Sequence, residues 1–300
     1  AVNNFFDPKN QHTVKVLPFL GEYSWSVVIA SLVLAFCVAA VLIGGVKRIA
    51  SVSQIIVPFM AVIYIVFVLV LVVCNITAVP AAFATIVKAA FSPKAITGGA
   101  VGSFLVAMQK GVARGIFSNE AGLGSAPIAA AAAQTKEPVR QGLVSMTGTF
   151  IDTIVICTLT GLSIVLTGAW QVDGLEGVQV TTYAFQNGLP LPKELSAFVL
   201  MLCLVFFAFT TILGWDYYSE RCLEYLSGGR MKYVKVYRWI YILAVFIGPY
   251  MTVSAVWTIA DIFNGLMALP NMIALFALSG VVVKETRHFF ERHRNGEIED

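Results

Sequence analysis

The sequence predicts an all-α polytopic membrane protein with about seven transmembrane spans, one of them a broken helix. Hydrophobic residues make up 58% of its 300 residues and charged residues only 12%, whereas soluble domains carry about 25% charge. The mean hydropathy is +0.81, and apolar segments long enough to cross a bilayer recur along the whole chain. Little sequence is left between these segments, so we expect a single transmembrane domain over residues 1–300.

The predicted spans are apolar runs bounded by glycine, proline or charged residues. They cover residues 24–46, 53–74, 102–134, 139–167, 195–213, 236 to about 256, and 269–283. The last run is short for a membrane helix, so we expect its start to lie earlier. Between the spans we expect a loop at 1–23, an interfacial segment at 76–100, a tight turn at 136–138, and connections at 169–194, 217–235 and 257–268.

Basic residues are unevenly shared between the two sides of the predicted topology. One side receives the basic residues of segments 47–48, 136–140, 221–238 and 284–294; the other receives Lys9, Lys15, Lys88, Lys94 and Lys193. Loops rich in Lys and Arg remain cytoplasmic. The C-terminus is therefore expected in the cytoplasm and residue 1 outside the cell membrane.

Residues 113–127, ARGIFSNEAGLGSAP, interrupt an otherwise apolar span. The glycines at 115, 122 and 124 weaken a helix, and Pro127 lacks a backbone donor. Irregular backbone at membrane depth is tolerated where it is buried in protein or lines a cavity, and in secondary transporters such breaks meet substrate and ions. We predict that residues 115–125 are not continuous α-helix; the alternative is a polar loop outside the membrane.

Charged groups inside the spans need partners, because each costs roughly 2.5 to 3.5 kcal/mol at the bilayer centre. Glu120 follows Arg114 by six residues, and we expect a structural ion pair between them that fixes the broken segment; the alternative places both in water at the interface. Asp152 is expected to pair with a basic residue of another span, with proton carriage as the alternative.

Adjacent hydroxyls at Thr210 and Thr211 lie in an apolar helix, with Trp215 one turn after Thr211. Threonine hydroxyls commonly bond to carbonyls of their own helix, but two such oxygens also suit a small hard cation. Trp215 lies on the same side, although most tryptophans in such helices pack or anchor at the interface.

An enzyme is not indicated. Residues 122–125 faintly suggest a serine nucleophile at Ser125, but His12, His288 and His293 all lie outside the spans, which disfavours a Ser-His mechanism. The five cysteines are scattered without paired spacing, and no phosphate-binding or dinucleotide motif occurs. We expect neither an organic cofactor nor a nucleic-acid partner.

Two stretches carry a family resemblance: GVARGIFSNEAGLGSAPIAAAAAQTKEPVRQGLVSMTGTFIDT at 111–153 and GGVKRIASVSQIIVPFMAVIY at 44–64. They resemble the alanine or glycine:cation symporters, the sodium:alanine symporter family. The resemblance implies a partial LeuT-like inverted-repeat bundle that lacks its first core helices, because nothing before residue 24 supplies them. Since the chain begins with Ala1, we expect an N-terminally truncated fragment with half-sites.

By this resemblance the broken helix is the sixth of the core and residues 195–218 form the eighth. Substrate contacts are then expected at Gly115, Ile116, Phe117, Ser118 and Trp215, and sodium ligands at Thr210 and Thr211. The implied function is sodium-coupled symport of alanine or glycine across the plasma membrane by alternating access, with sodium as coupling ion. The alternative is a non-transporting membrane scaffold or receptor subunit built on the same helices.

The charge distribution gives a first testable prediction. A cysteine placed near Arg294 should be inaccessible to an impermeant thiol reagent applied outside intact cells, because the basic segment after Lys284 is expected in the cytoplasm. Labelling from outside would contradict the topology.

Overall fold

A computed structural model describes residues 2–7, 12–15, 22–90 and 100–298, which fold into two compact units. Unit 1 combines Ala1–Lys88 with Leu159–Thr252, and unit 2 combines Ala89–Thr158 with Val253–Asp300. Each unit is described by itself. The expectation of one transmembrane domain therefore stays a prediction.

Unit 1 is built mainly from helices that contact α12. Its elements are α1 (Val2–Phe6), β1 (Thr13–Lys15), β2 (Glu22–Ser24), α2 (Trp25–Leu42), α3 (Gly45–Cys74), η1 (Ile76–Ala78), α4 (Val79–Ala90), α10 (Cys157–Leu166), η3 (Ala169–Gln171), α11 (Val178–Gly188), α12 (Lys193–Leu226), α13 (Met231–Ile247) and η4 (Gly248–Tyr250). The α4 and α10 helices each cross a unit boundary. The two strands form an antiparallel pair in which Val14 faces Tyr23.

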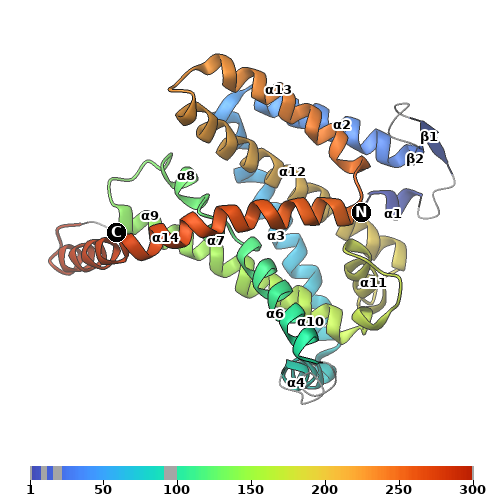
Figure 1. Ribbon diagram of the computed structural model, residues 1–300. Helices are drawn as coiled ribbons and strands as arrows, with labels where there is room; N and C mark the ends of the chain where they lie inside the picture. The colour runs from blue at the N-terminus through green and yellow to red at the C-terminus, as the bar shows by residue number, and fades with distance from the viewer. Residues whose placement is uncertain (1, 8–11, 16–21, 91–99, 299–300) are drawn as a thin grey trace. The chain divides into compact units, whose positions relative to one another are not determined.

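The core of unit 1 lies between α2, α12 and α13, which run close together in Figure 1. Val38, Val41 and Leu42 of α2 pack against Leu213 of α12. The hydroxyl of Tyr241 on α13 joins the same core and donates to the Ile212 carbonyl at 2.8 Å. This bond fixes α13 against α12 and satisfies a phenol that would otherwise be costly to bury.

Side-chain hydrogen bonds tie the remaining helices of unit 1 together. The hydroxyls of Tyr64 on α3 and Thr160 on α10 are 2.6 Å apart. At the end of α3, the Asn75 amide donates to the Gly188 carbonyl at 3.0 Å, so the last turn of α11 is held against α3. These bonds use polar atoms inside apolar helices, where water is not available to satisfy them.

Unit 2 contains the broken helix and its supports. Its elements are α6 (Ala100–Phe117), α7 (Glu120–Leu123), α8 (Ala126–Ala130), α9 (Pro138–Thr149), a π-helical segment η2 (Phe150–Ile156) and α14 (Val253–Arg294). The long α14 contacts α6, α7 and α9. Pro138 starts α9, where its missing N–H costs nothing, and Glu137 just before it pairs with Arg292 of α14 at 3.2 Å.

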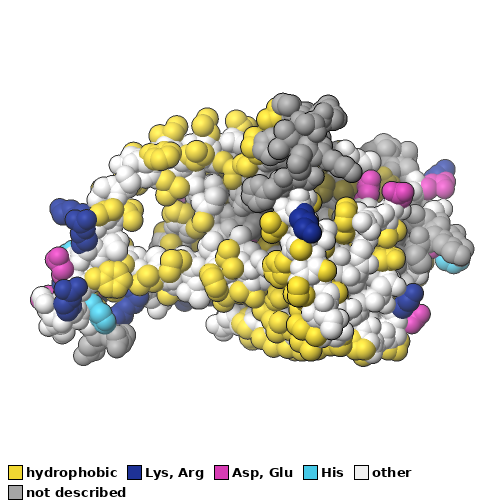
Figure 2. All heavy atoms as spheres, turned by 90° about the horizontal axis from the view of Figure 1, so that it is seen from below, with side chains coloured by type: hydrophobic (Ala, Val, Ile, Leu, Met, Phe, Trp, Pro, Cys, Tyr) yellow, Lys and Arg dark blue, Asp and Glu magenta, His cyan; other side chains and the backbone are white. Residues whose placement is uncertain are grey.

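The surface confirms the membrane class. Among the described residues, five helices are long and apolar enough to cross a membrane: Trp25–Leu42, Gly45–Cys74, Pro138–Leu166, Lys193–Leu226 and Val253–Arg294. Large apolar side chains such as Phe36 and Phe276 are 74% and 76% exposed. Hydrophobic side chains cover much of the face in Figure 2, where charged ones are few. The count of seven spans stays a prediction.

Several predicted connections are wrong because polar residues continue a helix. Residues 257–268 belong to α14. This helix begins at Val253, which confirms the expectation that the last span starts before residue 269. Much of 217–235 is helical, because α12 continues to Leu226 and Arg221 pairs with Glu224 one turn later. The connection 169–194 contains α11, and the loop 1–23 contains α1 and the two strands.

The close approach of α11 to α3 gives a second prediction. A Cβ added at Gly188 would lie 2.8 Å from Leu71 Cγ and from Thr167 Cγ2. Gly188→Ala should therefore destabilise the protein by about 1–3 kcal/mol through overpacking. The measurement is the thermal unfolding midpoint in detergent.

Gly161→Ala is the matched control, because a Cβ there meets nothing within 4 Å. In the helical context of α10 this change should be neutral or stabilising by up to about 1 kcal/mol. If Gly188→Ala and Gly161→Ala have equal unfolding midpoints, at or above that of the parent, the described close approach of α11 to α3 is contradicted.

Candidate functional site

The helix break predicted from the sequence is confirmed in unit 2. The α6 helix ends at Phe117, and Asn119 adopts an extended backbone with φ −142° and ψ 145° before α7 begins. The Asn119 side chain caps α7 by accepting the Ala121 N–H at 2.9 Å. Gly124 then ends α7 with φ +78°, a left-handed conformation that favours glycine. Residues 115–125 are therefore not continuous helix.

Two other helices hold this break in place. The hydroxyls of Ser118 and Thr153 are hydrogen-bonded at 2.9 Å, and the Thr149 hydroxyl donates to Asn119 Oδ1 at 3.2 Å. Thr153 lies in the π-helical segment η2, a distortion that frequently occurs at functional sites. From α14, the Asn271 amide donates to the carbonyls of Ala121 at 2.9 Å and Gly122 at 3.1 Å.

Arg114 is held by α14 at the end of α6. Its guanidinium donates to both carboxylate oxygens of Asp261, at 2.9 and 3.3 Å, and lies 3.9 Å from the ring centroid of Trp257. The ring of Phe117 meets the same indole edge-on at 6.0 Å. Planar bidentate pairing and stacking on an aromatic face are the two contacts that arginine makes best.

Sequence reasoning matched Arg114 to Glu120 and missed this partner. Asp261 lies in the segment expected to be a connection, so its acid was not counted among the charges at membrane depth. The continued apolar character of residues 255–268 could have placed Asp261 inside a span as a charge that needs a partner, but it does not identify Arg114 as that partner. That Arg114 also pairs with Glu120 stays a prediction.

A cavity of 380 Å³ lies beside this ion pair, between α6 and α14. Its lining includes Ile116, which was predicted to contact substrate, together with Gln109, Asp261 and Asn264. The Asn264 side chain is buried, and its Nδ2 has no hydrogen-bond partner among the described residues. The volume falls within the range of about 300–1,000 Å³ typical of small-molecule sites, and an orphaned amide donor suits a polar ligand.

The remaining predicted site residues lie on α12 in unit 1. The Thr210 hydroxyl donates to the carbonyls of Phe206 at 3.0 Å and Phe207 at 3.2 Å, which is the alternative interpretation that the sequence left open. Thr211 is exposed on this unit. Trp215 packs edge-on against Tyr218 at 5.9 Å. The structure thus divides the predicted residues between the units, with Gly115–Ser118 in unit 2 and the two threonines and Trp215 in unit 1.

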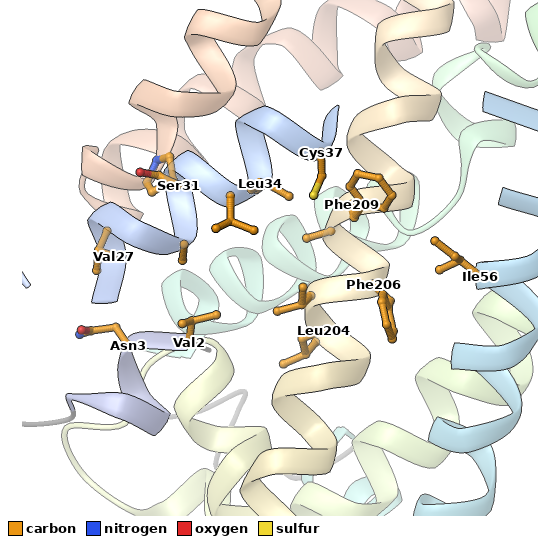
Figure 3. A pocket seen from close by; sticks show the side chains of 15 residues that line it. Val2, Asn3, Val27, Ser31, Leu34, Cys37, Ile56, Leu204, Phe206 and Phe209 are labelled. Atoms are coloured by element: carbon orange, nitrogen blue, oxygen red, sulfur yellow. The ribbon is translucent and has the colours of Figure 1, made fainter. Parts of the chain in front are cut away.

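A second cavity, which lies in unit 1, does not match an amino-acid site. It measures 620 Å³ and is lined by α1, α2, α3 and α12 with apolar side chains such as Leu34, Phe206 and Phe209 (Figure 3). Asn3, Ser31 and Cys37 are its polar members. Among the described residues, its lining includes no charged side chain and neither Thr210 nor Thr211. A zwitterion would find little compensation there for its lost hydration.

The tight turn after the break gives a third prediction. A Cβ on Gly122 would lie 2.6 Å from the Ile116 carbonyl oxygen, a backbone atom that cannot move aside cheaply. Gly122→Ala should lower the unfolding midpoint in detergent, at a cost of about 1–3 kcal/mol.

Gly115→Ala, seven residues earlier, is the control, because its Cβ would meet nothing within 4 Å. It should be neutral or slightly stabilising in the helical backbone of α6. Equal midpoints for the two variants would contradict the described geometry of the break.

Comparison with known proteins supports the resemblance seen in the sequence. An uncharacterized transporter of Haemophilus influenzae is 54% identical over 267 residues, which cover 89% of this chain and 58% of that protein. The sodium/alanine symporter AgcS of Methanococcus maripaludis is 48% identical over 89% of this chain and 58% of its own. The amino-acid carrier protein AlsT of Bacillus subtilis is 37% identical over 92% of this chain and 57% of its own.

The chain thus spans 58%, 58% and 57% of the lengths of these three relatives. The sequence profile of the family described as sodium:alanine symporters matches residues 9–300, nearly the whole chain. The matched family and the two named relatives are transporters, which confirms the expectation that the chain is not an enzyme. The chain belongs to the sodium:alanine symporter family.

Proposed function

We propose that this chain forms part of a sodium-coupled symporter of small neutral amino acids, alanine or glycine, in the cell membrane. The observation that carries the proposal is the break between α6 and α7, braced by α9, η2 and α14 and adjoined by the 380 Å³ cavity. Breaks of this kind form substrate and ion sites in secondary transporters. Among relatives, AgcS is named a sodium/alanine symporter, and GlnT of Bacillus subtilis a probable sodium/glutamine symporter.

The broken segment suits the recognition of a small zwitterion. The α6 helix has 18 residues and ends at Phe117, so its C-terminal end presents partial negative charge that favours an ammonium group or a cation. The backbone of Gly115–Ser118 leads into this end, and Ile116 also lines the neighbouring cavity. We assign Gly115, Ile116, Phe117 and Ser118 as substrate contacts on this basis, whereas a substrate contact at Trp215 rests on the family resemblance alone.

Sodium would be held in part by hydroxyl oxygens of α12. Thr211 is exposed on unit 1, and we assign its hydroxyl as one ligand. Thr210 donates its proton to its own helix and keeps lone pairs for a cation. Hydroxyl and carbonyl oxygens are the hard ligands that small cations prefer. Coupling follows if ion and substrate together stabilise one occluded state during alternating access.

The direct test is uptake of labelled alanine by the full-length protein in proteoliposomes. An inward sodium gradient should drive accumulation, and replacing sodium by potassium should abolish it. Uptake that does not require sodium would remove the coupling. A protein that binds neither alanine nor glycine would support the alternative of a scaffold or receptor subunit.

The assignment of Thr211 gives a fourth prediction. Thr211→Val keeps the shape of the side chain and removes one oxygen, so half-saturating sodium should rise about tenfold or more, equivalent to about 1.4 kcal/mol. Apparent alanine affinity should fall too, because coupling between two sites is reciprocal. Thr211→Ser keeps the oxygen and should be milder. The measurement is alanine uptake against sodium concentration at equal surface expression.

Thr85→Val on α4 is the matched control, because the Thr85 hydroxyl donates to the Ala81 carbonyl at 2.9 Å. A hydroxyl bonded to its own helix contributes about 1 kcal/mol or less to stability and does not bear on sodium dependence. Half-saturating sodium that is unchanged in Thr211→Val would remove Thr211 from the ion site.

A further inference from the structure

One acid in the core of unit 1 has no hydrogen-bond partner among the described residues. Asp216 of α12 is 0% exposed, and neither of its carboxylate oxygens has a hydrogen-bond partner among the described residues. An ionised carboxylate removed from water must be compensated by donors or by opposite charge; otherwise it takes up a proton.

The basic group nearest to this acid is already matched by another carboxylate. Arg238 of α13 donates from Nε and Nη2 to the two oxygens of Glu220, at 2.6 and 2.9 Å. Glu220 lies one turn after Asp216 on α12 and is only 3% exposed. Such bidentate pairing balances one charge with one charge. Ionised Asp216 would place a second negative charge beside this pair in a buried site.

The remaining titratable neighbours do not donate a hydrogen bond to Asp216. The titratable and charged groups that interact electrostatically with Asp216 are Glu220, Arg238, Tyr237 and Tyr241. The Tyr241 hydroxyl donates to the Ile212 carbonyl instead.

The helices α2 and α3 contribute apolar side chains to the adjoining core. The basic residues at the start of α3, Lys47 and Arg48, are exposed. Among the described groups that interact electrostatically with Asp216, Arg238 is the one cation, and Glu220 already pairs with it.

We propose that Asp216 is a proton-binding site, whose carboxyl carries a proton in the conformation described here. Releasing that proton requires water or a cation to reach the acid, which in turn requires α12 and α13 to separate. The site lies five residues after Thr211 on the same helix. If the proposed symport holds, α12 carries a proton site as well as its sodium ligands.

Infrared spectroscopy of the purified protein tests the protonation state directly. In sodium-free detergent buffer at neutral pH, the parent-minus-Asp216→Asn difference spectrum should contain the carbonyl stretch of a protonated carboxylic acid. Glu194→Gln removes an exposed acid from the first turn of the same helix and should leave that band unchanged. A parent without the band, or a band that persists in Asp216→Asn, would overturn the proposal.

The pH dependence of stability provides a second measurement. An aspartate in the unfolded chain releases its proton above about pH 4, whereas the buried carboxyl in the folded chain keeps it. Between about pH 4 and neutral pH, the stability of the fold should therefore fall as pH rises, by up to about tenfold in the unfolding equilibrium constant per pH unit. Asp216→Asn cannot titrate and should lack this component, whereas Glu194→Gln should retain it. A stability difference between parent and Asp216→Asn that does not change with pH would also overturn the proposal.

Asp216→Leu removes the titrating group with an apolar side chain of similar size, and serves in both measurements if the asparagine variant does not fold. Neither measurement uses transport. A failure of sodium-coupled uptake would therefore leave the proton site standing, and a failure here would leave the symport proposal untouched.

Discussion

Unit 2 depends on the hydrogen-bond partners that the protein supplies to polar groups freed by the break between α6 and α7; lipid supplies none to a break at membrane depth. Asn271 of α14 donates to the Ala121 and Gly122 carbonyls, and Thr149 and Thr153 bond to Asn119 and Ser118. The broken helix is therefore supported by two others, the continuous α9–η2 segment and α14. The same supports place Asp261 and Trp257 against Arg114, which fixes the end of α6 beside the cavity.

In unit 1, polar groups also find their partners within the protein, but along an unbroken helix. The α12 helix has 34 residues and keeps its backbone bonds, so its polar side chains carry the interactions instead. Thr210 bonds back to its own helix, Ile212 accepts the Tyr241 hydroxyl, and Glu220 pairs with Arg238. Asp216 lies among them without a partner among the described residues. An ion site and a proton site on one rigid helix would both respond to any movement of that helix.

Local chemistry was predictable from the sequence, whereas long-range pairing was not. The break could be predicted because glycine, asparagine and proline act through their own backbone conformation. Arg114 and Asp261 are 147 residues apart, and a single sequence contains no signal of that pairing. Asp261 and Asn264 interrupt the apolar run at the beginning of α14, which is why the sequence predicts a connection at residues 257–268. The burial of Asp216 could not be predicted because Asp216 lies between the apolar run 195–213 and the polar segment 217–235, where the sequence predicts a connection.

Sodium-coupled transport is the central claim, and alanine-driven sodium flux tests it most directly. Proteoliposomes containing the full-length protein should take up labelled sodium faster when alanine is added outside at zero membrane potential, because a symporter moves both solutes in one cycle. Glycine should act similarly and a large charged amino acid should not. Sodium entry that is the same with and without alanine or glycine would contradict the coupling, and with it the proposed role of the broken helix.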